Sequence, residues 1–198
     1  MKIRETSFVY VKKNYKEIIR KICDLDKIKP SKKPFTLFMA GSPGSGNNSD
    51  KVQRAATLLF DKTFDLIQKK NINAIIDTTF ASPKSISNVK RALGRNRNVA
   101  IIYLHEDPFR AWEFTKKREK IEGRCVPKDV FINAYFAAQK NVIKVKQKYG
   151  KSVELHLFEK DKNFNYKNKA KFNINSLESY LNNNHTRHEL EKKLPNKL

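Results

Sequence analysis

Four short apolar segments alternate with longer amphipathic stretches along the chain, and this alternation is the strongest constraint on the fold. The apolar segments cover residues 35–40, 72–77, 99–104 and 153–158. Each has the length and composition of a strand that is buried on both faces of a sheet. Strands that alternate with helices predict an α/β domain with a mainly parallel sheet flanked by helices.

The stretches between these strands carry apolar residues at three- and four-residue steps, which predicts helices. We expect helices over 5–28, 49–70, 82–94, 108–120 and 127–149, and shorter ones at 175–182 and 185–194. The sequence predicts three parts. They are an N-terminal helix and linker over 1–34, the α/β domain over 35–160, and a basic, Asn- and Lys-rich segment over 161–198.

The chain is strongly basic, with 42 Lys and Arg against 20 Asp and Glu, a formal net charge of +22. Such a charge favours nucleic acids, phosphates and anionic surfaces as partners. The basic residues are spread along the chain, however, and accompany no groove-reading helix or RNA-binding signature. We therefore do not expect a nucleic acid as partner, and keep a basic nucleic-acid-binding or polynucleotide kinase protein as an alternative function.

Other features limit the location and the metal chemistry of the protein. No apolar run reaches the length of a membrane span, and residues 1–5 do not resemble a signal peptide. Cys23 and Cys125 are expected to be reduced thiols of a cytoplasmic protein. The four His residues show no metal-ligand spacing, so we expect no protein-held metal site.

A glycine-rich loop follows the first predicted strand directly and precedes a helix. It consists of Gly41, Ser42, Pro43, Gly44, Ser45 and Gly46. This context is typical of a loop whose backbone N–H groups cradle phosphates, although an ordinary Gly/Pro turn is the alternative. Asn47 and Asn48 stand where such loops carry Lys and Ser or Thr. An amide lacks the charge of Lys and is a poor substitute for the Mg²⁺-binding hydroxyl.

Three segments of the chain resemble the zeta toxin family of P-loop kinases: residues 38–46, 74–80 and 118–127. The resemblance implies a Rossmann-like P-loop NTPase/kinase fold with an N-terminal helix. It further implies an enzyme that uses ATP and Mg²⁺ to phosphorylate a nucleotide sugar, UDP-N-acetylglucosamine, and an antitoxin as protein partner.

The resemblance also reveals a gap after the glycine loop. Family members continue from the loop into Lys-Thr, a helix, a strand and a catalytic Asp. Here residues 47–51 resemble the end of a later family segment joined directly to Gly46. We interpret this as an internal deletion; substitution at the two loop positions is the competing explanation and leaves the missing strand and Asp unexplained.

The resemblance carries over to individual residues. Gly41 to Gly46 would line the ATP phosphates, and Arg118 and Arg124 would be catalytic arginines near the transferring phosphate. Substrate contacts would come from Asp77, Thr79, Asn48, Ser49 and Asp50.

Simpler structural roles remain open for several of these side chains. Asp77 could cap the turn after its strand, and Arg118 could be a solvated helix residue. Asp107, just before Pro108, is expected to cap a helix, and Tyr135 to lie in the core. Besides an impaired kinase, a catalytically inactive nucleotide- or partner-binding remnant is therefore a second hypothesis.

Overall fold

The computed structural model describes residues 2–41, 53–123, 125–159, 170–181 and 185–195. The chain forms two compact units. Unit 1 consists of Met1–Pro34 and Asn47–Ala74, and unit 2 of Phe35–Gly46 and Ile75–Leu198. Each unit is described by itself below.

Unit 1 is built on a pair of helices, α1 (Lys2–Ile22) and α2 (Gln53–Lys69), with a short 3₁₀ turn, η1 (Leu25–Lys27). Its core contains Ile19, Leu25 and Ile72, which are buried because the apolar residues of both helices face each other. Two cations of α2 lie over aromatic rings of α1. The Arg54 guanidinium is 4.3 Å from the Phe8 ring centroid, and the Lys62 ammonium is 5.4 Å from that of Tyr15.

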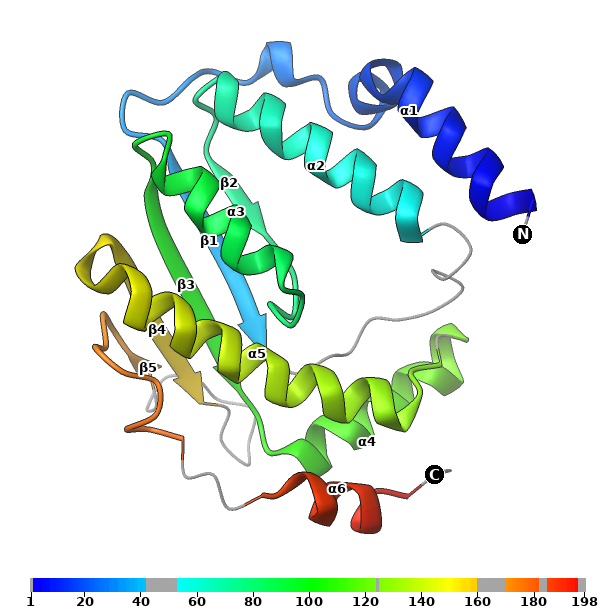
Figure 1. Cartoon of the computed structure of the whole chain (residues 1–198), viewed down its shortest axis with the longest axis vertical. Coiled ribbons are helices and arrows are strands. Elements are labelled where there is room, and N and C mark those ends of the chain that lie inside the picture. Colours follow the sequence, from blue (N-terminus) through cyan, green and yellow to red (C-terminus); the bar gives the residue numbers. More distant parts are fainter. Residues whose placement is uncertain (1, 42–52, 124, 160–169, 182–184, 196–198) are drawn as a thin grey trace. The chain divides into compact units, whose positions relative to one another are not determined.

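Unit 2 is organised around a five-stranded sheet with the order β2-β1-β3-β4-β5 (Figure 1). The strands are β1 (Phe35–Gly41), β2 (Ala74–Ile76), β3 (Asn98–His105), β4 (Val153–Glu159) and β5 (Ala170–Lys171). Strand β3 pairs in parallel with β1 and with β4, and the register places Gly41 beside Leu104. Strand β5 pairs antiparallel to β4 and lies at an edge of the sheet.

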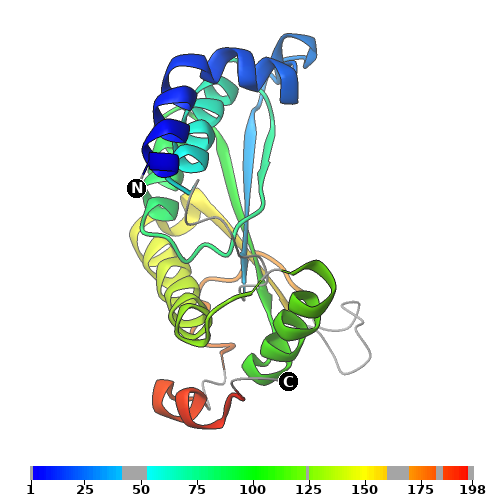
Figure 2. The same ribbon diagram turned by 90° about the vertical axis from the view of Figure 1, so that its right-hand side faces the viewer.

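Helices α3 (Lys84–Leu93) and α5 (Lys128–Tyr149) contact each other and cover one face of this sheet. Figure 2 shows both on the same side of the strands. The alternation along β3 places Val99, Ile101 and Tyr103 on the buried face, where they are at most 3% exposed. The apolar stripe of α5, which includes Val142, packs on this face and completes the main core.

A second cluster of apolar residues joins α4 (Pro108–Glu122), the first half of α5 and α6 (Arg187–Lys193). Its members include Trp112 and Phe131, whose rings meet edge to face at 5.0 Å. Leu190 and Leu194 bring the C-terminal segment into this cluster, at 0% and 2% exposed. The Trp112 indole N–H also donates to the carbonyl of Pro195 at 2.9 Å. Helix α6 is therefore part of the packed body of unit 2.

The expected α/β fold with a mainly parallel sheet flanked by helices, and an N-terminal helix, is confirmed. The prediction of a helix at 175–182 is wrong for the described residues 175–181, which form bends and turns. There Leu177 is buried and Ile174 donates its N–H to the Leu155 carbonyl at 2.8 Å, so tertiary contacts hold the segment. Strand β5 was not predicted, because two residues carry no periodic signal. Within the described ranges, no helix is both long and apolar enough to cross a membrane.

Candidate functional site

The carboxyl ends of β1, β2 and β3 carry the residues that sequence analysis singled out. Strand β1 ends at Gly41, β2 is followed by Asp77, Thr78 and Thr79, and β3 ends at His105. In parallel α/β sheets, ligands bind beyond this edge. Unit 2 therefore presents a candidate site where β1 meets the turn after β2.

Hydrogen bonds tie that turn to the end of β1. The Gly41 N–H donates to the Thr79 carbonyl at 3.3 Å, and the Thr78 hydroxyl donates to the Met39 carbonyl at 3.3 Å. Inside the turn, the threonine hydroxyl oxygens accept backbone N–H groups: Thr78 from Phe80 at 3.2 Å, and Thr79 from Ala81 at 3.3 Å. Hydrogen bonds therefore hold the end of β1 and the Asp-Thr-Thr segment together.

The threonines, rather than Asp77, make the capping bonds of this turn. The Asp77 residue is exposed, and within the described residues its carboxylate makes no hydrogen bond or ion pair. Among the described residues, nothing therefore occupies its carboxylate oxygens at the carboxyl edge of the sheet.

Asn141 of α5 holds the next residues of the turn, and sequence analysis missed it. Its side-chain N–H₂ lies 3.0 Å from the Phe80 carbonyl, 3.0 Å from the Ala81 carbonyl and 3.3 Å from the Ser82 carbonyl. Phe80 has a left-handed φ of 61° and is 1% exposed. The available signal was an Asn among mostly apolar residues on the buried side of α5, since buried amides need partners.

Gly41 is required by the close approach of β1 and β3. A Cβ atom at this position would lie 2.9 Å from the Leu104 carbonyl oxygen and 3.3 Å from the Leu104 Cβ. The space next to this glycine is therefore filled by the neighbouring strand. The other loop residues, Ser42, Pro43, Gly44, Ser45 and Gly46, lie outside the described residues, as do Asn48, Ser49, Asp50 and Arg124.

Arg118, the other predicted catalytic arginine, lies on α4 and pairs with Glu122 one turn later. Its Nε and one terminal nitrogen each lie 3.2 Å from a carboxylate oxygen of Glu122. The Arg118 side chain is 42% exposed, so solvent weakens this pair. On the same helix the Lys116 ammonium lies 2.7 Å from Glu119, whose pKa is lowered by that hydrogen bond.

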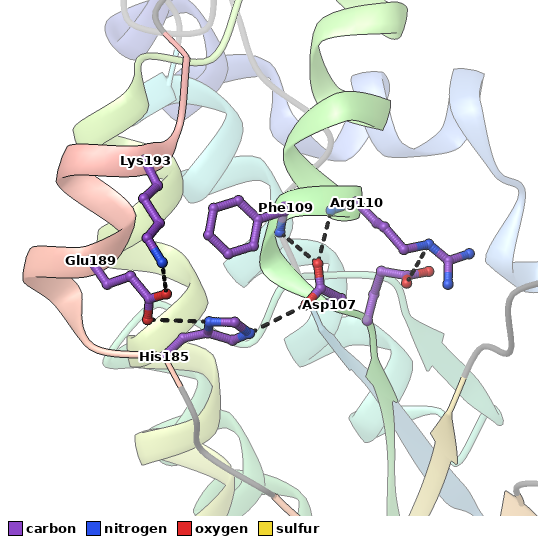
Figure 3. Close-up of polar contacts among 7 residues, drawn as sticks. Asp107, Phe109, Arg110, His185, Glu189 and Lys193 are labelled. Carbon is purple, nitrogen blue, oxygen red and sulfur yellow. Dashed lines mark hydrogen bonds and ion pairs between the residues drawn. The ribbon is translucent and has the colours of Figure 1, made fainter.

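The end of β3 leads into a polar cluster around the start of α4 (Figure 3). Asp107 caps the helix, as expected: its Oδ1 accepts the N–H of Phe109 at 2.9 Å and of Arg110 at 3.1 Å. The second oxygen of Asp107 lies 3.3 Å from His185 Nε2, and His185 Nδ1 lies 3.4 Å from Glu189. This cluster fastens the segment before α6 to the start of α4.

His105 ends β3 beneath this cluster. Burial lowers the pKa of His105, and this effect outweighs the opposite influence of Glu159 and Asp107. Its Nδ1 is buried without a hydrogen-bond partner among the described residues. Folding therefore favours the neutral form of the His105 imidazole.

Comparison with solved structures places the chain in the P-loop-kinase-like α/β fold class. A chain from the PezAT chromosomal toxin–antitoxin system of Streptococcus pneumoniae matches with a TM-score of 0.57 and 11% identity. The match covers 96% of this chain and 87% of that chain. A search of curated protein sequences gives no match.

The sequence model of the family described as zeta toxin matches residues 47–171. This is more than half of the 198 residues, and the chain therefore belongs to the zeta toxin family.

Proposed function

We propose that this chain is a zeta-toxin-type phosphotransferase with an impaired nucleotide loop. In this proposal it uses ATP and Mg²⁺ in the cytoplasm to phosphorylate a nucleotide sugar such as UDP-N-acetylglucosamine, and an antitoxin restrains it. The observation that carries the proposal is the bonded turn after β2. It holds Asp77 at the carboxyl edge of the sheet beside the end of β1, with its carboxylate free of partners within the described residues.

The chemistry of the residues at this edge fits the proposed ligands. Asp77 and Thr79 offer carboxylate and hydroxyl oxygens. Such oxygens coordinate Mg²⁺, and they accept hydrogen bonds from sugar hydroxyl groups. Arg118 and Arg124 supply positive charge for a transferring phosphate, once Arg118 leaves the solvent-exposed pair with Glu122. Membership of the zeta toxin family and the fold shared with a PezAT chain support the kinase and antitoxin parts.

The impairment follows from the loop sequence. Asn47 and Asn48 carry neither the charge nor the hydroxyl of a complete phosphate loop. The family match begins at Asn47, directly after Gly46, which supports an internal deletion at this junction. A chain that binds nucleotide or a partner without transferring phosphate is the alternative that these features favour.

Two measurements on the full chain separate these functions. Calorimetric titration with Mg-ATP tests the loop, with Gly44→Val as the variant that blocks it. Phosphate transfer from labelled ATP to UDP-N-acetylglucosamine tests the chemistry. We expect weak ATP binding that the Gly44→Val variant abolishes, together with slow transfer.

Asp77→Asn is the variant that tests the site itself. We expect it to lower transfer about 100-fold or more, because an amide lacks the negative charge and the basicity of the carboxylate that the proposal places against the substrate. Asp129→Asn makes the same charge change on an exposed residue of α5 and serves as the matched control. ATP binding without transfer would support the inactive binding protein, and equal transfer by both variants would remove Asp77 from the site.

A further inference from the structure

The outer face of the α3–α5 layer is basic, and beyond the first turn of α5 its helices contain no acidic residue. No Asp or Glu occurs between Thr78 and His105, or between Val130 and Val153. These stretches contain α3, the part of α5 after Val130 and the turns after both helices. Six of the exposed cations here are called the α3–α5 face: Lys90, Arg95, Lys140, Lys144, Lys148 and Lys151.

The fold brings these cations together. Lys140, Lys144 and Lys148 form one row along α5, at steps of about 6 Å, because every fourth residue of a helix lies on the same side. Arg95 and Lys151 come from the turns just before β3 and β4, which pair in parallel with Val99 beside Val153. Figures 1 and 2 show α3 and α5 side by side on the same side of the sheet.

Several other cations of unit 2 behave differently. On α4 and α6, Arg118 pairs with Glu122 at 3.2 Å and Lys193 with Glu189 at 2.8 Å, each one turn away, whereas Lys117, Lys120 and Lys192 have no ion pair within the described residues. Within the acid-free stretches, Arg97 and Lys146 turn inward and donate to the carbonyls of Phe35 and Val153. The members of the α3–α5 face have no ion pair within the described residues.

The helix dipole explains why some cations of the α3–α5 face are favourable in the free protein, but not all of them. Lys90 and Lys148 lie in the last turns of their helices, where a cation is favoured by the helix dipole. Lys140 and Lys144 lie in the interior of α5, where that effect is absent. Mutual repulsion along the row destabilises the free protein, and an anionic partner would relieve it.

We propose that the α3–α5 face binds the phosphate backbone of a double-stranded nucleic acid without reading its sequence. Among the large exposed apolar residues of the described chain, only Val130, in the first turn of α5, lies on either helix, so the row of lysines has no apolar anchor beside it for a protein partner. It also has no exposed aromatic ring on which the bases of a single strand could stack. A row of cations alone matches the regular charge of a duplex.

The test uses the full chain and a short labelled DNA duplex, with binding followed by fluorescence anisotropy at several salt concentrations. The same measurement is made with an RNA duplex of the same sequence. It shows whether the face prefers the backbone of DNA or that of RNA. The face variant is Lys140→Gln, Lys144→Gln and Lys148→Gln combined. The control variant, Lys12→Gln, Lys13→Gln and Lys16→Gln combined, removes the same charge from exposed residues of α1.

We expect the face variant to weaken duplex binding about tenfold or more. It should also reduce the slope of log Kd against log salt by about 3, because three phosphates are no longer neutralised by a lysine. The control variant should keep the slope of the unmodified chain. Both variants are checked for the same melting temperature, so that a folding defect is not mistaken for weaker binding.

Two outcomes would overturn the proposal directly: equal weakening by the two variants, or no duplex binding by the unmodified chain. Binding of poly-glutamate but not of duplex through the same lysines would also overturn it, in favour of an acidic protein partner.

Discussion

The side-chain N–H₂ of Asn141 donates to the carbonyl oxygen of Phe80 at 3.0 Å, across 61 positions of sequence. This bond connects α5, which packs against one face of the sheet, to the turn that holds Asp77 and Thr79 at the edge of the sheet. It also supports a residue in the left-handed region, a conformation that costs about 1 to 3 kcal/mol and persists only where its surroundings enforce it. The candidate site therefore depends on a residue outside it.

Replacing Asn141 with Ala should lower the free energy of unfolding by about 2 kcal/mol, because buried carbonyl groups lose their donor. Urea denaturation followed by circular dichroism measures this. Asn133→Ala is the control, since Asn133 makes its hydrogen bond with Arg187 at the exposed surface. An equally small loss in both variants would contradict the role assigned to Asn141.

Asn141→Asp provides a second test with a defined sign. A carboxylate next to three carbonyl oxygens is disfavoured, so the pKa of the new side chain would be raised in the folded state. The stability of this variant should then be greatest at acidic pH and decline as pH rises through that raised pKa, relative to the unmodified chain at each pH. Urea titrations at several pH values would show this difference.

Gly41→Ala should destabilise the protein by about 1 to 3 kcal/mol, because the new methyl group would lie 2.9 Å from the Leu104 carbonyl oxygen. Thermal unfolding measures the effect. Gly123→Ala is a useful comparison, since its Cβ meets no atom within 4 Å and only its left-handed φ of 66° opposes the substitution. A Gly41 variant as stable as the parent chain would show that β1 and β3 can separate without cost.

The partly buried His105 should make the protein less stable as the pH falls. Its folded-state pKa lies below the ordinary value of 6.5, so the unfolded chain binds the proton more readily. The contribution is complete above about pH 6.5 and is lost as the pH falls through the folded-state value. His105→Phe should flatten the stability profile in this range. His188→Phe, at an exposed position, should leave the profile unchanged.

Leu190→Ala should cost about 2 to 4 kcal/mol, since Leu190 is 0% exposed within the cluster of α4, α5 and α6. Chemical denaturation measures the loss. The neighbouring Glu191→Ala removes an exposed ion pair with Arg187 at 3.5 Å and should change stability little. A Leu190 variant with parental stability would show that α6 is not part of the packed body.

Features that depend on neighbouring residues could be recognised from the amino-acid sequence alone. The alternation of strands and helices, the cap at Asp107 and the helix end at Gly123 all follow from local periodicity and backbone preference. The glycine loop and the Asp-Thr-Thr turn could be located in the same way, because they directly follow recognisable strands.

Contacts between residues that are distant in sequence became visible only in the folded chain. Asn141 holds the turn after β2, Leu190 enters the core, and the lysines of α5 join Arg95 on one acid-free face. None of these relationships has a local signature, because each arises when packing of helices on the sheet brings separate segments together. The order of charges along the chain suggested evenly spread cations, whereas the fold pairs some with carboxylates, buries others and leaves one face unpaired within the described residues. The residue type sets the charge of a side chain, whereas the packing of the fold decides which other charges lie near it.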